Sequence, residues 1–206
     1  MGAGRSEVMR AVFGIDPKET GEVYIKGNKV DIKSPRDAML HGMGFVPEDR
    51  KLQGLVLGMS VGKNTTLAAL KAVANKAGFI NHKQEKDMAD KFVKALEVKT
   101  PSNDQLVKNL SGGNQQKVVI AKWLANNPDI LILDEPTRGI DVGAKKEIHQ
   151  LMSDLANQGV AIIMISSELP EVLGMSDRVL VMKDDAIVAV LEGEKINAVE
   201  VMRYAL

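Results

Sequence analysis

The chain of 206 residues contains no cysteine, which excludes disulfides and thiolate chemistry and fits a reducing compartment. It also lacks an excess of either charge, because 27 Lys and Arg balance 27 Asp and Glu. No global field therefore attracts nucleic acid or anionic lipid, and such a partner would have to be met locally. The longest apolar runs are strand-sized, far short of the roughly 20 residues that a spanning helix needs. Composition alone thus predicts a soluble cytoplasmic α/β protein of one domain.

The apolar residues near the start of the chain predict alternating helices and strands. Helical spacing predicts a helix over 6–13, and period-two alternation predicts a hairpin over 22–33. Gly27, taken as the first residue of the hairpin turn, predicts a type II′ connection. Ser34 followed by a proline predicts the N-terminus of a short helix over 35–41.

Residues 60–109 break this alternation, since their apolar residues recur at helical spacing and predict an inserted helical lobe. The alternation then returns. Helices are expected near 114–126, 142–157, 168–173 and from Asn197 on, with strands near 43–46, 130–133, 160–165, 178–182 and 186–191. Strands that alternate with helices predict a mostly parallel sheet covered on both faces.

Two short motifs carry most of the chemistry. Residues 110–116 read Leu-Ser-Gly-Gly-Asn-Gln-Gln and predict a turn that opens a helix, where bare backbone N–H groups can meet a phosphate. The apolar strand over 130–133 ends in Asp134 and Glu135. At such a strand end one acid can hold a nucleotide's Mg²⁺ and the second can act on an attacking water. A simple helix-entry turn and an acidic cap of the next helix are the structural alternatives.

The first residues resemble the end of a phosphate-binding loop, G-x-x-x-x-G-K-[ST]. Gly2 and Gly4 would let the backbone close around phosphates, and Ser6 would bring a hydroxyl to Mg²⁺. In this alignment Arg5 occupies the lysine position, and the leading glycine would precede Met1. The chain is therefore expected to begin inside the loop. A capped helix start is the alternative interpretation.

Together these motifs resemble the ATP-binding cassette of ABC transporters over essentially the whole chain. The resemblance implies an α/β fold with a P-loop NTPase-type, mostly parallel sheet, flanking helices, an antiparallel N-terminal hairpin and an inserted helical subdomain over 60–109. Residues 1–206 would form one nucleotide-binding domain. In that family 110–116 is the signature motif, Asp134 the metal-binding acid, Glu135 the catalytic carboxylate and 138–141 the D-loop, which ends at Asp141.

Three further runs, at 47–51, 54–60 and 165–171, narrow the resemblance. They are similar to the C-terminal cassette of fused two-cassette ATPases that drive ribose-type monosaccharide import. That resemblance implies ATP and Mg²⁺ as cofactors and a partner cassette in a head-to-tail dimer. It also implies transmembrane permease subunits and, indirectly, a sugar-binding protein, with no nucleic acid, at the cytoplasmic face of the membrane.

Three positions depart from a fully competent cassette. Arg5 replaces the loop lysine, and a forked guanidinium is not equivalent to a compact ammonium in a tight loop. Glu48 stands for a glutamine, and an ionised carboxylate cannot donate a hydrogen bond. Ser167 stands for the switch histidine, whose charge and proton a hydroxyl cannot supply. Ser167 is also expected to cap the helix that follows it.

These departures predict two unequal ATP sites in a cassette pair. The site built on this chain's own loop would bind nucleotide and hydrolyse it slowly. The chain would act chiefly by donating Ser111, Gly112, Gly113 and Gln115 to the partner's ATP. A non-hydrolysing regulatory nucleotide-binding module is one alternative. A soluble ABC protein of DNA repair or translation is another, and it would predict long coiled-coil or basic insertions.

Overall fold

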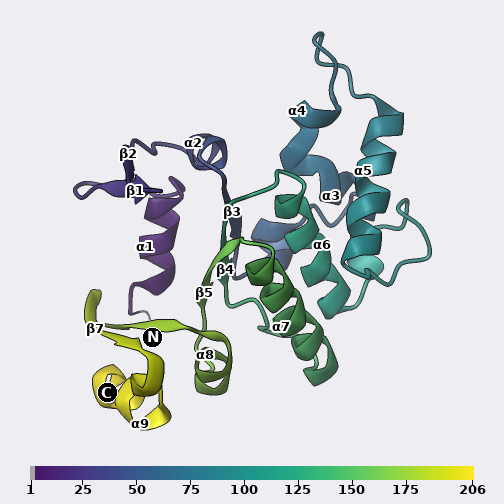
Figure 1. Cartoon of the computed structure of the whole chain (residues 1–206). Coiled ribbons are helices and arrows are strands. Elements are labelled where there is room, and N and C mark those ends of the chain that lie inside the picture. Colours follow the sequence, from purple (N-terminus) through teal and green to yellow (C-terminus); the bar gives the residue numbers. More distant parts are fainter. Residues whose placement is uncertain (1–2) are drawn as a thin grey trace. The chain divides into compact units, whose positions relative to one another are not determined.

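The computed structural model describes residues 3–206, and their contacts divide the chain into two compact units. The central unit is Gly42–Met164, and the terminal unit joins the residues up to His41 to Ile165–Leu206. Figure 1 labels most of the helices and strands of both. Each unit is described by itself.

A parallel sheet forms the core of the central unit. Its strand order is β3 (Met43–Val46), β4 (Ile130–Asp134) and β5 (Ala161–Ile165). β3 pairs with β4 in parallel, with Phe45 opposite Ile132. All of β3 and most of β4 are buried, as expected for strands of a sheet covered on both faces. The predicted parallel sheet is confirmed.

Two long helices follow the predicted motifs of this unit. α6 (Gly112–Leu124) begins at the glycine pair, and α7 (Val142–Asn157) connects β4 to β5. The two helices pack against each other. α7 has an apolar stripe whose buried members are Ile148, Met152 and Leu155. This spacing is the helical period that the sequence showed.

Residues 60–109 are helical, as predicted, and Figure 1 shows them in blue and teal. Their helices are α3 (Val61–Thr66), α4 (Leu70–Val73) and α5 (His82–Ala95), with the 3₁₀ turns η2 (Leu67–Ala69) and η3 (Val107–Asn109). α3 packs on both α5 and α6. The buried Asn64 ties α3 to the preceding chain: its Oδ1 accepts from the Val56 N–H at 2.8 Å. Whether this region is a separate lobe stays a prediction.

A short π-helix, η1 (Arg50–Gly54), was not predicted. Asp49 caps it, since its Oδ1 accepts from the N–H groups of Lys51 at 2.9 Å and Leu52 at 3.0 Å. π-helices are rare and concentrate at functional sites. The hydrogen bonds of Asp49 thus hold the first turn of η1, directly after Glu48.

The first part of the terminal unit is helix, hairpin, helix: α1 (Arg5–Val12), β1 (Val23–Ile25), β2 (Asn28–Val30) and α2 (Pro35–Leu40). Ser34 caps α2 as predicted, accepting from the Asp37 N–H at 3.3 Å. The type II′ prediction was wrong. Val23 pairs with Val30, so the turn residues are Lys26 and Gly27, with φ of 51° and 77°. Positive φ at both central positions defines a type I′ turn.

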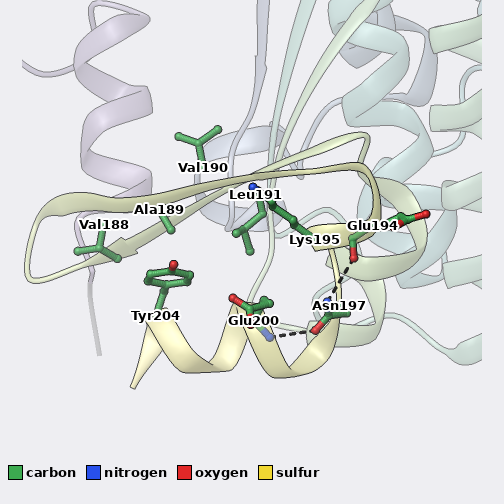
Figure 2. A pocket seen from close by; sticks show the side chains of 9 residues that line it. All are labelled: Val188, Ala189, Val190, Leu191, Glu194, Lys195, Asn197, Glu200 and Tyr204. Atoms are coloured by element: carbon green, nitrogen blue, oxygen red, sulfur yellow. Dashed lines mark hydrogen bonds between the residues drawn. The ribbon is translucent and has the colours of Figure 1, made fainter.

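The second part of the terminal unit contains α8 (Leu169–Met175), the antiparallel pair β6 (Arg178–Lys183) and β7 (Ala186–Glu192), a 3₁₀ turn η4 (Gly193–Lys195) and α9 (Ala198–Ala205). The apolar core of this part consists of Val179, Val181, Leu191 and Val201. Figure 2 shows a pocket between β7 and α9, with Asn197 at the start of the helix accepting from the Glu200 N–H. The residues that line this pocket are not among the predicted site residues.

No helix formed by residues 3–206 is long and apolar enough to cross a bilayer.

Candidate functional site

The acid pair lies at the carboxyl end of β4. Asp134 is the last residue of the strand and is 3% exposed. Glu135 follows with φ of +47°, a left-handed conformation that few residues other than glycine adopt. The chain therefore leaves the strand direction immediately after Asp134, and the Arg138 N–H closes the turn on the Glu135 carbonyl at 3.1 Å.

The signature serine lies at an exposed helix tip. Ser111 precedes α6, and the first intrahelical bond runs from the Gln115 N–H to the Ser111 carbonyl at 2.9 Å. The N–H groups of Gly112 and Gly113 come before that bond and have no acceptor within the helix. The Ser111 side chain does not cap them. Bare N–H groups and the positive end of the helix dipole together favour an anion at this tip.

Asn114 orients the Ser111 hydroxyl, and sequence reasoning missed it. Asn114 Oδ1 accepts from the Lys99 N–H at 2.7 Å, and its Nδ2 donates to Ser111 Oγ at 2.9 Å. A backbone N–H can only donate, so it fixes which end of the amide faces Ser111. Ser111 Oγ accepts that bond, so its own hydrogen points elsewhere and can be donated to a ligand. The spacing of three residues on one helix face was the available signal.

Gln115 lies away from this tip. Its side chain belongs to a residue only 3% exposed, and its Nε2 donates to the Val107 carbonyl at 3.2 Å. The structure therefore brings Asn114, rather than the predicted Gln115, to Ser111.

The two glycines have packing reasons of their own. A Cβ on Gly113 would lie 2.5 Å from the Cβ of Ala144 on α7, closer than real Cβ atoms approach. A Cβ on Gly112 would lie 3.0 Å from Arg50 Nη2 and 3.3 Å from the Gly139 carbonyl oxygen. The glycine pair thus lets α6 start close to both α7 and the loop at 138–139.

Glu48 and Asp141 both meet the loop after the acid pair. Glu48 forms an ion pair with Arg138. Asp141 is the N-cap of α7, and its Oδ1 accepts from the Ala144 N–H at 2.9 Å. The Asp141 carboxylate, which was predicted to bind nucleotide, therefore caps α7 in this structure.

The remaining predicted site residues belong to the terminal unit, except that Gly2 lies outside the described residues. Gly4 is the N-cap of α1 with φ of 73°, and a Cβ there would lie 2.5 Å from Asp185 Oδ1. Arg5 Nη1 donates to the carbonyl of Ser166 at 2.8 Å, so the Arg5 side chain lies beside the residue that precedes Ser167. Ser6 is the second residue of α1, whose first N–H groups have no acceptor within the helix.

Ser167 does not cap the next helix, so that prediction was wrong. The N-cap of α8 is Glu168, and the Glu168 N–H donates to Ser166 Oγ at 3.0 Å. The Ser166 hydroxyl accepts this local hydrogen bond; Ser166 is buried and Ser167 is exposed.

The residues present fit a nucleotide with Mg²⁺. Among residues 3–206 no group of three or more His, Asp or Glu could hold a metal by itself. Mg²⁺ rarely needs such a cage, because one or two carboxylates with phosphate oxygens and waters complete its shell. Asp134 offers a hard oxygen donor at a strand end, and the tip of α6 offers N–H donors suited to phosphate.

Comparison with solved structures places the fold among ATP-binding cassettes. The chain is similar to a nucleotide-free ATP-binding cassette from an ABC transporter, with a TM-score of 0.80 and 23% identity over 98% of this chain and 80% of that one. It is also similar to a dimeric cassette in a post-hydrolysis state bound to ADP and Pi, with a TM-score of 0.76 and 26% identity over 93% and 81%.

Sequence comparison gives curated relatives of higher identity. A ribose import ATP-binding protein of Geobacillus kaustophilus is 55% identical over 100% of this chain and 41% of its own length. A putative ribose/galactose/methyl galactoside import ATP-binding protein of Agrobacterium fabrum is 52% identical, with the same coverage. The chain thus spans about two fifths of these relatives. Residues 1–138 match the family model described as ABC transporter, so the chain belongs to the ABC transporter family.

Proposed function

We propose that this chain is an ATP-binding cassette that binds ATP with Mg²⁺ and couples its hydrolysis to monosaccharide import. The observation that carries the proposal is the exposed Ser111 at the tip of α6: Asn114 leaves its hydroxyl hydrogen available, next to N–H groups that have no acceptor within the helix. The sugar class rests on the ribose and galactose import relatives. The proposed location is the cytoplasmic face of the membrane, on permease subunits that a sugar-binding protein supplies.

In the site formed by the chain's own loop, Mg²⁺ would supply positive charge that stabilises the negative charge developing on the phosphate oxygens. Asp134 would hold the metal through water, and the Ser6 hydroxyl would be a second ligand. Gly4 and Arg5 would face phosphate oxygens from the start of α1. Glu135 would accept a proton from the attacking water.

Glu48 and Ser167 would complete that site less well than the residues usual in the family. Glu48 already pairs with Arg138, and Ser167 has no charge to offer a phosphate. Arg5 is held by the Ser166 carbonyl, so part of its fork is engaged. We expect the lost charge-assisted contact of the switch residue, where Ser167 now stands, to lower hydrolysis at this site by about 10²- to 10³-fold.

The chain would serve chiefly as donor to the ATP of a partner cassette in a head-to-tail dimer. Ser111 would donate its hydroxyl, and Gly112 and Gly113 their N–H groups, to the terminal phosphate. Gln115 would act indirectly, since its side chain supports the turn that precedes α6 through the Val107 carbonyl.

ATP turnover by the complete protein, with its partner cassette, tests this proposal through two variants. Ser111→Glu puts a carboxylate at the exposed tip, and we expect turnover to fall by about 10²-fold. Glu135→Gln removes the base of the slow site only, and we expect turnover to fall by less than half. Ser111 is a better position than Gly112, because a side chain at 112 would also displace Arg50.

Gln84→Glu on the exposed face of α5 adds the same charge elsewhere and serves as the control. Equal losses from Ser111→Glu and Glu135→Gln would contradict the asymmetry. ATP binding without turnover in the wild-type protein would favour the regulatory, non-hydrolysing module instead.

A further inference from the structure

Arg50 joins three segments of the central unit. It is the first residue of η1, and its side chain is partly buried. Nη1 donates to the Arg138 carbonyl at 2.7 Å and Nη2 to the Gly139 carbonyl at 2.9 Å. The planar guanidinium thus grips two consecutive carbonyls with its fork, an arrangement that a single ammonium cannot reproduce.

A second link runs between the same two segments in the opposite direction. Glu48, two residues before Arg50, pairs with the side chain of Arg138. Arg50 of the first segment therefore binds backbone carbonyls of the second, and Arg138 of the second binds the Glu48 carboxylate of the first. Two residues on each side are tied, so the segments resist both separation and sliding.

The gripped loop begins at the acid pair. The Arg138 N–H is bonded to the Glu135 carbonyl at 3.1 Å, and Thr137 between them is 2% exposed. A displacement of the Arg138 and Gly139 carbonyls is therefore passed to Glu135 through one hydrogen-bonded turn whose middle residues are buried.

The third segment is the tip of α6. Arg50 Nη2 lies where a side chain on Gly112 would begin, 3.0 Å from the position of its Cβ. The Gly139 carbonyl, which Nη2 binds, lies 3.3 Å from the same position. Gly112, the signature residue next to Ser111, therefore lies against the Arg50 guanidinium that binds the loop at 138–139.

We propose that Arg50 is a positioning residue that fixes the loop after Glu135 against the tip of α6. Movement of the segment that starts at Glu48 then reaches the acid pair and the signature serine together. The inference rests on the proposed function for its catalytic consequence, but the grip itself can be measured on this chain alone.

Amide hydrogen exchange on the 206-residue chain tests the grip. Arg50→Met keeps the aliphatic stem and removes both donors, and we expect the Arg138 and Ala144 amides to exchange about tenfold faster or more. Arg50→Lys keeps the charge without the fork, and we expect an intermediate increase. Lys51→Met, an exposed neighbour on the same π-helix, is the matched control and should change neither rate.

Amides of α5, including the Leu96 N–H bonded to the Phe92 carbonyl, report general stability. Unchanged exchange at Arg138 in Arg50→Met would overturn the proposal. An equal increase at Arg138 and throughout α5 would also overturn it, since that result indicates general destabilisation.

Steady-state ATP turnover by the complete protein separates this inference from the proposed function. Because the tip of α6 donates to the partner's ATP, its displacement in Arg50→Met should lower kcat at least tenfold. KM for ATP should change less than twofold, because no contact with nucleotide is removed. Wild-type turnover with an unaltered kcat in Arg50→Met would overturn the inference alone. Absence of wild-type turnover would overturn the proposed function, and the exchange measurement would still decide the grip.

Discussion

At the level of single residues, Lys122 shows how the buried side of α6 constrains the fold. The residue is 7% exposed; its Nζ donates to the Gly54 carbonyl and lies 5.3 Å from the centre of the Trp123 ring. Burial lowers the pKa of this ammonium to about 8. The carbonyl and the aromatic ring offset part of the cost of burying this charge.

The lowered pKa predicts a rise of stability with pH. Unfolded Lys122 binds its proton up to about pH 10.5 and the folded form only to about 8, so the cost of the buried charge is full below pH 8 and fades towards 10.5. Between pH 7 and pH 10 the unfolding free energy of the wild type should gain about 2 kcal/mol relative to Lys122→Met. Urea denaturation of both proteins measures the difference.

Lys51→Met, which changes an exposed lysine, should show no such pH-dependent difference from the wild type. Parallel pH profiles for wild type and Lys122→Met would mean that Lys122 remains charged in the fold throughout this range.

Among the elements, the contact of α6 with α7 depends on one missing methyl group. Gly113 is the second residue of α6, and the space for its Cβ is already taken by Ala144. Helix propensity alone would favour alanine over glycine by about 1 kcal/mol. The close approach of two helices therefore overrides propensity at this position.

Gly113→Ala should lower the unfolding free energy by about 1 to 3 kcal/mol, the usual cost of overpacking. Ala144→Gly removes the opposing methyl group, so the double variant should recover most of that loss. Thermal denaturation of the two single variants and the double variant measures the coupling. Additive losses in the double variant would show that the two side chains do not compete for space.

Asp141 can stabilise the start of α7 in two ways, by accepting a capping hydrogen bond or by its negative charge, and two variants distinguish them. Asp141→Ala should cost about 1 kcal/mol of stability, because the Ala144 N–H loses its acceptor. Asp141→Asn keeps an acceptor oxygen and should cost only a few tenths of that amount. Chemical denaturation checks both variants. A similar loss in both would indicate that the negative charge, not the cap, holds the helix end.

For the molecule as a whole, periodicity and turn chemistry were enough to predict the order of the strands and of the longer helices. The parallel β3–β4 pair, the cap at Ser34 and the carboxyl-end acids were all visible as local patterns. The functional motifs were visible for the same reason, since each is a continuous run of residues.

Contacts between distant segments could not be predicted in this way. Arg50 reaches carbonyls 88 and 89 residues away, and backbone carbonyls carry no sequence signal. The positive φ of Lys26 was not predicted, because conformational propensity favours a positive φ at the neighbouring Gly27 and not at a lysine. Asn114 was missed because one of its two partners is the backbone N–H of Lys99, and a backbone N–H carries no sequence signal.

The division into two contact units predicts local loss of structure. Leu191 is buried in the terminal unit with Val179, Val181 and Val201. Leu191→Ala should destabilise that unit by about 2 to 5 kcal/mol. Amides of β6 and β7 should then exchange faster, while those of β3 and β4 keep their protection. Equal loss of protection in β3 and β4 would show that the two units unfold as one.

The narrow space at Gly4 has a consequence for how the protein is made. Asp185, in the tight connection between β6 and β7, lies where any side chain at position 4 would start. The first helical turn therefore meets its neighbour only after some 180 further residues have been synthesised. During synthesis this turn cannot pack against the β6–β7 connection until that hairpin has emerged from the ribosome, so a polypeptide truncated between Gly4 and Asp185 would lack this contact.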